Sequence, residues 1–337
     1  DGGDGGGGAS RLREEWFLFQ RQRGPIAGAL LLLAYGALIV FRNLAYFRYR
    51  AGDRLRDAGF EAFAEFTPAE LRYADTPIHL TYALDGAVFL GAVIGPSGVA
   101  RLRGLVRLPA RADGAPEHHP HLVTILRRML CVYALGHTLR GFTYLSTTLP
   151  GSADHCLPGA ALDPPRTLLE CFYRVSSVNG NCGDLIFSGH MLFMWLSLGL
   201  IHRYGADAWA VPRHGTAHVA AMSACVLLTL VQAVFILKAR HHYTVDVVVA
   251  TYTVPLMWHF HNTVVQPADL KVDRAHIEKA IEADRDRPLW QRIALVIQTI
   301  LMLAFLVLAL LVIVHGNFRF IGVGGHPASS IAGPHGW

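Results

Sequence analysis

Charged residues are scarce in this chain. Asp, Glu, Lys and Arg together make up 16% of its 337 residues, whereas hydrophobic residues make up 52%. A soluble domain carries about 25% charged residues, and several apolar runs here reach the roughly 20 residues that a helix needs to cross a bilayer. The composition argues against an ordinary soluble domain and predicts an all-α fold, a polytopic transmembrane helical bundle.

The chain also lacks the short motifs of nucleotide and metal chemistry. It contains no P-loop, no HExxH and no Gly-rich turn placed between a strand and a helix. Its five cysteines form no CxxC pair, which argues against a zinc site. The net charge of +5 is not accompanied by a nucleic-acid recognition motif. We therefore expect no cofactor, no metal and no nucleic-acid partner.

Three of the cysteines, Cys156, Cys171 and Cys182, cluster around one long loop. If that loop faces an oxidising compartment, one disulfide is expected among them, and the sequence does not choose the pair. The remaining two, Cys131 and Cys225, fall inside apolar runs and are expected to pack as small hydrophobic side chains.

Seven apolar runs are candidate membrane spans. They lie near residues 25–47, 79–99, 122–149, 185–201, 217–237, 243–264 and 293–314. Lys and Arg are more frequent in the loops that become cytosolic when the N-terminus is inside, which favours that orientation. The fourth and sixth spans then both enter from the non-cytosolic side, so His190 and His242 are expected at similar depth on the same face.

Both histidines have acidic or hydroxyl side chains nearby that could take part in catalysis. His190 follows Asp184 and Ser188, and His242 lies four residues before Asp246, a spacing that puts both on one face of a helix. Asp246 could hold one ring nitrogen of His242 and leave the other as a base or nucleophile. His190 could then protonate a leaving oxygen. This combination suits displacement at phosphorus.

Most histidines at the end of a membrane helix are interfacial residues without a chemical role. We apply that interpretation to His241, His137, His259 and His261. His190 and His242 differ because each opens a span, each has a neighbouring acid, and both face the same side. Ionisable groups at membrane depth are costly and indicate function when they have partners.

Arg140 lies inside the third span, where a buried cation needs an anion. Two interpretations stay open: it holds the phosphate of a lipid headgroup, or it pairs with Asp85, Asp184 or Asp246. Asp85, inside the second span, could itself bind a cationic headgroup.

Three sequence patterns resemble those of the sphingomyelin synthase family, which includes ceramide phosphoethanolamine synthases and the plant and protozoan inositol phosphorylceramide synthases. The family's Cys-Gly-Asp, three residues, Ser-Gly-His pattern is matched at Cys182 to His190, and its His-Tyr-Thr-x-Asp-Val pattern at His242 to Val247. The third, an arginine pattern, is matched at Arg127, Arg128, Arg140 and Thr147, with His137 in place of its tyrosine.

The resemblance implies a six-helix core like that of the lipid phosphatases, with the seventh span as an addition. It implies transfer of a phospho-headgroup from a glycerophospholipid to ceramide, with His242 as nucleophile, Asp246 as its orienting partner and His190 as acid and base. Substrate contacts are expected from Arg140, Asp184, Ser188, Tyr243 and Asp85.

The resemblance also divides the chain into a basic tail at 1–24, a six-span catalytic domain at 25–264, and a linker, extra span and short tail at 265–337. The expected partners are ceramide, a glycerophospholipid and the bilayer, with a homo-oligomer left open. The expected location is the Golgi or plasma membrane, with the site facing the lumen or the exterior.

Departures from the family leave the headgroup open among choline, inositol and ethanolamine. The Pro-Leu-Pro-Asp pattern before the second span is missing, and Thr76-Pro77-Ile78-His79 occupies that region. A lipid phosphate phosphatase, which uses water as acceptor, is the second hypothesis, although its Lys-x6-Arg-Pro and Ser-Arg-x5-His patterns are absent. An inactive scaffold or transporter is the third, and the retained triad argues against it.

Overall fold

The computed structural model describes residues 14–15, 17–19, 39–106, 120–160, 162–174, 182–266 and 288. Within these residues all regular structure is helical, which confirms the all-α prediction. Besides a helical stretch at 39–48, the elements are α3 (Ala58–Ala62), α4 (Pro68–Leu71), α5 (Thr76–Val106), α6 (Leu122–Ser146), η1 (Asp154–Cys156), α7 (Glu170–Tyr173), α8 (Gly189–Leu200), η2 (Ile201–Gly205), α9 (Ala206–Ala208), α10 (Thr216–Lys238), α11 (Thr244–Phe260) and η3 (His261–Val265).

Among the described residues, three helical segments are long and apolar enough to cross a membrane: Pro68–Gly95, Leu122–Ser146 and Thr216–Lys238. They correspond to the expected second, third and fifth spans. The fourth and sixth appear as α8 and α11, each of which continues into a short π-helical turn, η2 or η3. Most of the first span and all of the seventh lie outside the described residues, so the seven-span count and the domain division stay predictions.

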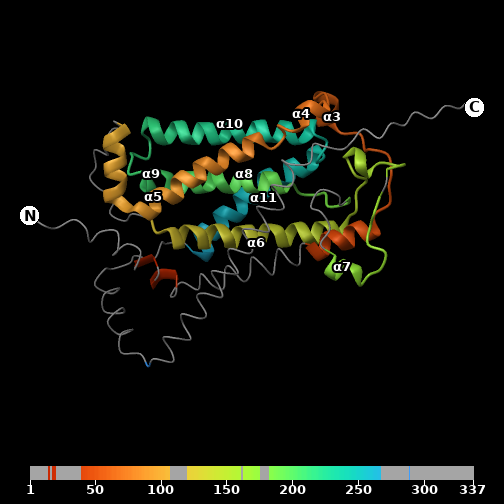
Figure 1. Cartoon of the computed structure of the whole chain (residues 1–337), viewed down its shortest axis with the longest axis horizontal. Coiled ribbons are helices and arrows are strands. Elements are labelled where there is room, and N and C mark those ends of the chain that lie inside the picture. Colours follow the sequence, from red (N-terminus) through yellow and green to blue (C-terminus); the bar gives the residue numbers. More distant parts are fainter. Residues whose placement is uncertain are drawn as a thin grey trace, which may run out of the picture.

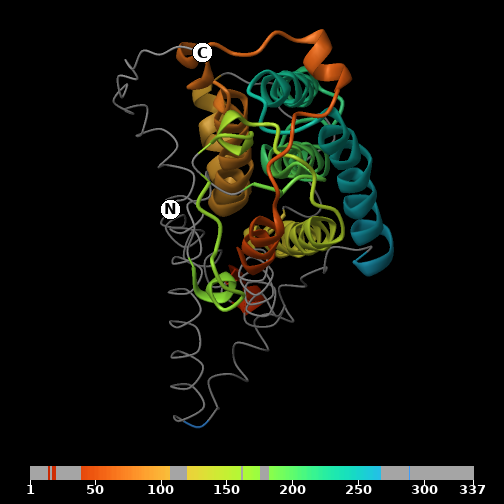
Figure 2. The ribbon, with the colours of Figure 1, turned by 90° about the vertical axis from the view of Figure 1, so that its right-hand side faces the viewer.

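Helix α8 is the centre of the bundle, with α5, α6, α10 and α11 around it (Figure 2). Its apolar side chains face two clusters because it is buried on several sides. Met191, Leu192 and Leu196 pack with α10 and α11, and Leu200 packs with α5 and α6. A helix that is apolar all round is typical of a protein core or of a membrane span, so the sequence of α8 fits its central position in the bundle.

Helix α5 bends at Gly95, which has φ 69° and ψ −179° inside a segment that is otherwise helical. A positive φ of this size is readily adopted only by glycine, and Pro96 follows it. The bend ends the membrane-length part of α5 and turns the chain across one end of the bundle (Figure 1).

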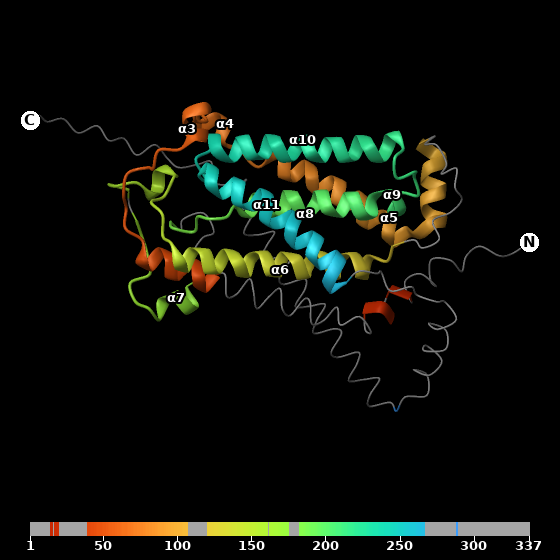
Figure 3. The ribbon, with the colours of Figure 1, turned by 180° about the vertical axis from the view of Figure 1, so that it is seen from behind.

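The opposite end of the bundle brings together the segments that carry the sequence motifs. The C-terminus of α6, the N-termini of α8 and α11, and the short helices α3, α4 and α7 all lie there (Figure 3). A disulfide between Cys156 and Cys182, with 5.7 Å between their Cα atoms, joins the long loop to the segment before α8. This disulfide identifies which two of the three loop cysteines pair, since Cys171 is free and buried.

The fourth expected span begins four residues later than the sequence suggests, at Gly189 instead of residue 185. The backbone N–H of Ile186 donates to the Asp246 side chain at 2.9 Å, and that of Ser188 donates to the Asp246 carbonyl at 3.2 Å. These donors bind the next helix of the site and are not available for a helical turn. The apolar pattern alone does not reveal this difference.

Candidate active site

His242 and Asp246 form a buried pair at the start of α11. The Nδ1 atom of His242 lies 2.9 Å from Oδ2 of Asp246, and the side chains are 9% and 0% exposed. A carboxylate only accepts hydrogen bonds, so Nδ1 carries the proton. The Nε2 atom makes no hydrogen bond within the described residues, and it keeps a lone pair for attack or proton transfer.

The local backbone explains why this pair is rigid. His242 precedes the helix, Tyr243 is the N-cap, and Asp246 is in the first turn and reaches back. Oδ2 also accepts from the backbone N–H of Tyr243 at 3.2 Å, while Oδ1 accepts from that of Ile186 at 2.9 Å. Asp246 therefore fixes the His242 ring and joins the segment before α8 to α11 through one side chain.

His190 is the second residue of α8, where Ser188 caps the helix by accepting from Met191 N at 3.4 Å. Its ring centroid lies 6.2 Å from that of His242, with the planes at 74°. Two hydrogen-bonding or bonding contacts to one phosphate span a similar distance. The structure thus brings together the three residues that the sequence predicted to carry the chemistry.

Two further residues of the site were missed by the sequence analysis or given no role there. The Oδ1 atom of Asp75, in the turn before α5, lies 3.2 Å from Nε2 of His190. The ring of His241 stacks against that of His190 at 6.1 Å and 23°. Burial, helped by His190, His242 and His155 and opposed by Asp75, lowers the pKa of His241 to about 4.

A sequence signal for Asp75 does exist. An Asp directly before Thr76-Pro77 at the start of an apolar run is typical of a helix N-terminus. With the N-terminus inside, the second span enters from the same face as the fourth and sixth. The same parity that paired His190 with His242 would have put Asp75 beside them.

Arg140 reaches the start of α8 from α6. Its Nε donates to the carbonyl of Phe187 at 2.7 Å, and its Nη1 lies 3.3 Å from Nδ1 of His137. A Cβ on Gly189 would stand 2.7 Å from Nη1, so only glycine at that position lets the guanidinium come this close. Among the described residues Arg140 has no carboxylate partner, so pairing with Asp85, Asp184 or Asp246 is not what the structure has.

The other predicted substrate contacts hold protein groups in this structure. Asp184 forms an ion pair with Arg42 at 2.9 Å, and the hydroxyl of Tyr243 accepts from Leu55 N at 3.1 Å. Ser188 is the α8 cap described above; it and Tyr243 adjoin the histidines in the chain, and Asp184 lies four residues before Ser188. Their predicted contact with substrate stays a prediction.

Asp85 lies apart from the histidines. It is 3% exposed and accepts a 2.7 Å hydrogen bond from Ser197, in the middle of the bundle. Ten residues separate it from Asp75, which is about 15 Å along a helix. The structure does not bring this predicted contact to the other site residues.

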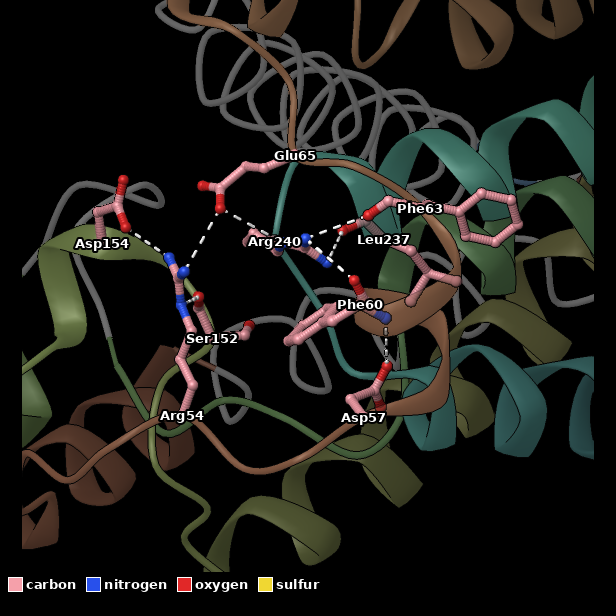
Figure 4. Close-up of polar contacts among 9 residues, drawn as sticks. All are labelled: Arg54, Asp57, Phe60, Phe63, Glu65, Ser152, Asp154, Leu237 and Arg240. Atoms are coloured by element: carbon pink, nitrogen blue, oxygen red, sulfur yellow. Dashed lines mark hydrogen bonds and ion pairs between the residues drawn. The ribbon is translucent and has the colours of Figure 1, made fainter.

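Arg240, in the turn before the two neighbouring histidines, binds the segment at residues 54–66 (Figure 4). Arg240, which directly precedes His241, donates to the carbonyls of Phe60 and Phe63 at 3.4 and 3.1 Å and lies 3.4 Å from Glu65. Asp57 caps α3 and also accepts from Thr244 N at 2.8 Å. The segment thus anchors both sides of His242.

The fold and site define the class: a helical bundle with membrane-length helices that holds two His–Asp pairs at one end. The family model described as PAP2 superfamily C-terminal matches residues 181–263, which contain both histidines. The curated "Phosphatidylinositol:ceramide inositolphosphotransferase 3" of Arabidopsis thaliana is 34% identical over 257 residues, covering 74% of this chain and 74% of that protein.

Two further relatives match over shorter regions. "Phosphatidylinositol:ceramide inositolphosphotransferase" of Oryza sativa subsp. japonica is 36% identical over 157 residues, 42% of this chain and 43% of that protein. Human "Phosphatidylcholine:ceramide cholinephosphotransferase 1" is 33% identical over 152 residues, 41% of this chain and 33% of that protein. The aligned region thus spans less than half the length of these two relatives. The extended Arabidopsis match shows the family: this chain belongs to the sphingomyelin synthase family.

Proposed function

We propose that this chain is a ceramide phosphotransferase. It transfers the phospho-headgroup of a glycerophospholipid to the primary hydroxyl of ceramide and releases diacylglycerol. The observation that carries the proposal is the pair of imidazoles, with ring centroids 6.2 Å apart, at the starts of two helices, one of them held by a buried carboxylate at 2.9 Å. Covalent catalysis at phosphorus needs this combination of a fixed nucleophile and a neighbouring acid.

In the first half-reaction, Nε2 of His242 attacks the donor phosphorus. The bond from phosphorus to the diacylglycerol oxygen breaks, and that oxygen takes a proton from His190. The product is a phospho-headgroup bound to His242, whose positive ring is stabilised by Asp246 at 2.9 Å.

In the second half-reaction, the ceramide hydroxyl gives its proton to His190, now neutral, and its oxygen attacks the phosphorus. The bond between phosphorus and His242 breaks, which restores both histidines. The same residue acts as acid and then as base, and no external proton is consumed.

Arg140 is the proposed phosphate contact. The guanidinium lies beside Gly189, at the start of the helix that carries His190, and it has no carboxylate partner among the described residues. Arginine binds phosphate oxygens in a forked geometry, so it can hold the donor while His242 attacks.

Phosphatidylinositol is the donor we favour, because the Arabidopsis relative matched over 74% of both chains is named for it. We also propose that the site faces the lumen of the Golgi or the cell exterior. The disulfide between Cys156 and Cys182 supports an oxidising side, since it lies at the same end as the histidines. Asp184, Ser188 and Tyr243 border this site as proposed substrate contacts.

A lipid phosphate phosphatase is the second candidate, because the PAP2 match covers both histidines. The two functions share the histidine chemistry and differ only in the acceptor. Water would then attack the phosphohistidine in place of ceramide.

The experiment uses the full chain in vesicles with labelled ceramide and, in separate samples, phosphatidylinositol, phosphatidylcholine or phosphatidylethanolamine. We expect a labelled sphingophospholipid, with the highest yield from phosphatidylinositol. A parallel sample with phosphatidic acid and no ceramide tests the phosphatase. Phosphate release there, with no labelled lipid in the others, would replace the first proposal by the second.

A further inference from the structure

We propose that Asp75 is a positioning residue for His190, so that each histidine of the site has its own carboxylate. The inference rests on the proposed function, in which His190 transfers protons. Asp75 lies in the turn before α5, and its Oδ1 is 3.2 Å from Nε2 of His190.

The position of Asp75 would suit a helix cap, but its side chain does not act as one. A capping aspartate accepts hydrogen bonds from the first free backbone N–H groups of its helix. The backbone carbonyl of Asp75 accepts from His79 N at 3.2 Å, whereas the carboxylate makes no hydrogen bond to backbone within the described part of the chain. The carboxylate is directed instead at His190, and the rings of His79 and His241 interact with it electrostatically.

This contact decides which nitrogen of His190 serves the substrate. The 3.2 Å contact is an ion-pair distance and not a well-aligned hydrogen bond, and it lies on the Nε2 side of the ring, which leaves Nδ1 for the substrate. That atom is buried, and the described residues offer it no hydrogen-bond partner. A buried ring nitrogen without a partner is ready to receive a substrate oxygen. Nδ1 would thus donate to diacylglycerol and later accept from ceramide.

The arrangement mirrors the pair at α11. Asp246 holds Nδ1 of His242 and leaves Nε2 for attack, while Asp75 faces Nε2 of His190 and leaves Nδ1 for proton transfer. Loss of the Asp75 charge should therefore impair proton transfer and leave nucleophilic attack intact. The test therefore measures proton transfer and nucleophilic attack separately.

The test compares Asp75→Asn with the unaltered chain on two donors. One is the natural glycerophospholipid, whose leaving oxygen needs a proton. The other is a nitrophenyl phosphodiester with the same headgroup, whose leaving group needs none. We expect transfer from the natural donor to ceramide to fall about 10- to 100-fold, near the lower range of general acid–base catalysis. The single-turnover burst of nitrophenolate should change by less than about threefold, because it reports attack by His242 alone.

The matched control is Asp163→Asn, which removes an exposed carboxylate paired with Arg174 at the end of α7. It should leave both donors unchanged. Asp75→Glu, which restores the charge on a longer side chain, should recover part of the natural-donor activity.

Three outcomes would overturn the inference. Equal loss on both donors in a folded Asp75→Asn protein would make Asp75 merely structural, and failure of Asp75→Glu to recover any activity would agree with that. No loss on the natural donor would remove Asp75 from the reaction. If the unaltered chain makes no sphingophospholipid from any donor, the proposed function itself fails and the inference falls with it.

Discussion

The two His–Asp pairs of the site contain the same side chains but are built differently. His242 and Asp246 are four residues apart, and their side chains are 9% and 0% exposed. His190 and Asp75 come from different helices, and their side chains are 29% and 19% exposed. Asp246 also holds two backbone N–H groups, whereas Asp75 faces histidine rings.

This difference fits the two roles. A nucleophile must be held in one orientation, since a displacement of about 1 Å can cost 10²-fold in rate. An acid that later becomes a base serves two oxygens in succession, so its ring must accommodate two different substrates. The rigid pair belongs to one helix start, and the more exposed pair forms between helices. Each variant below changes one side of this comparison.

The largest effect is expected for His242→Ala. Removal of the nucleophile should lower transfer about 10⁴-fold or more and abolish the acid-labile phosphohistidine. Trapping with labelled donor in the absence of ceramide measures that intermediate. His259→Ala, an exposed histidine on the same helix, is the control and should keep full activity. A labelled intermediate in His242→Ala would assign the nucleophile to another residue.

Asp246→Asn should have the second-largest effect, and comparison with Asp75→Asn should distinguish the roles of the two carboxylates. We expect transfer to fall about 10³- to 10⁴-fold, because an amide can hold the wrong tautomer of the ring. The buried carboxylate also binds Ile186 N and Tyr243 N, so Tm should fall by roughly 5 °C. Asp75→Asn should change Tm less, since Asp75 makes fewer contacts. Equal melting curves for the two variants would contradict the proposed difference in rigidity.

Arg140→Gln should have a smaller effect, confined to the donor. The loss of a charged phosphate contact should raise the KM for the glycerophospholipid about tenfold and leave that for ceramide unchanged. Arg213→Gln, which removes an exposed arginine paired with Asp207, is the matched control. Kinetics with each substrate varied in turn provide the measurement. An unchanged donor KM would show that Arg140 supports only Phe187 and the start of α8.

The sequence predicted the local part of this site and missed the distant part. The His242–Asp246 contact follows from a spacing of four residues, and the shared face of His190 and His242 follows from span parity. Asp75 was missed because its partner is on another helix, and a contact between helices depends on how they pack. The disulfide was left open for the same reason. Arg140 could not be assigned because three carboxylates on separate spans competed for it.

The smallest effect concerns His241, which lies between the two pairs. Burial lowers its pKa to about 4, from an ordinary value near 6.5 in the unfolded chain. Between these values the unfolded chain binds a proton that the folded protein excludes, so acidification favours unfolding in this range. Above the pKa of the unfolded chain, His241 is neutral in both the folded and the unfolded state, and it adds no pH dependence to the stability.

His241→Gln should therefore weaken the fall of Tm between pH 7 and pH 5 and leave Tm at pH 7 nearly unchanged. Thermal melts of both proteins at the two pH values provide the measurement, and the difference between them isolates His241 from other titrating groups. Transfer at pH 7 should change little, because His241 stacks on His190 while Asp75 and Asp246 face His190 and His242 themselves. Parallel curves for the two proteins would mean that His241 takes up its proton in the folded state, which would place a second cation beside His190 in mild acid.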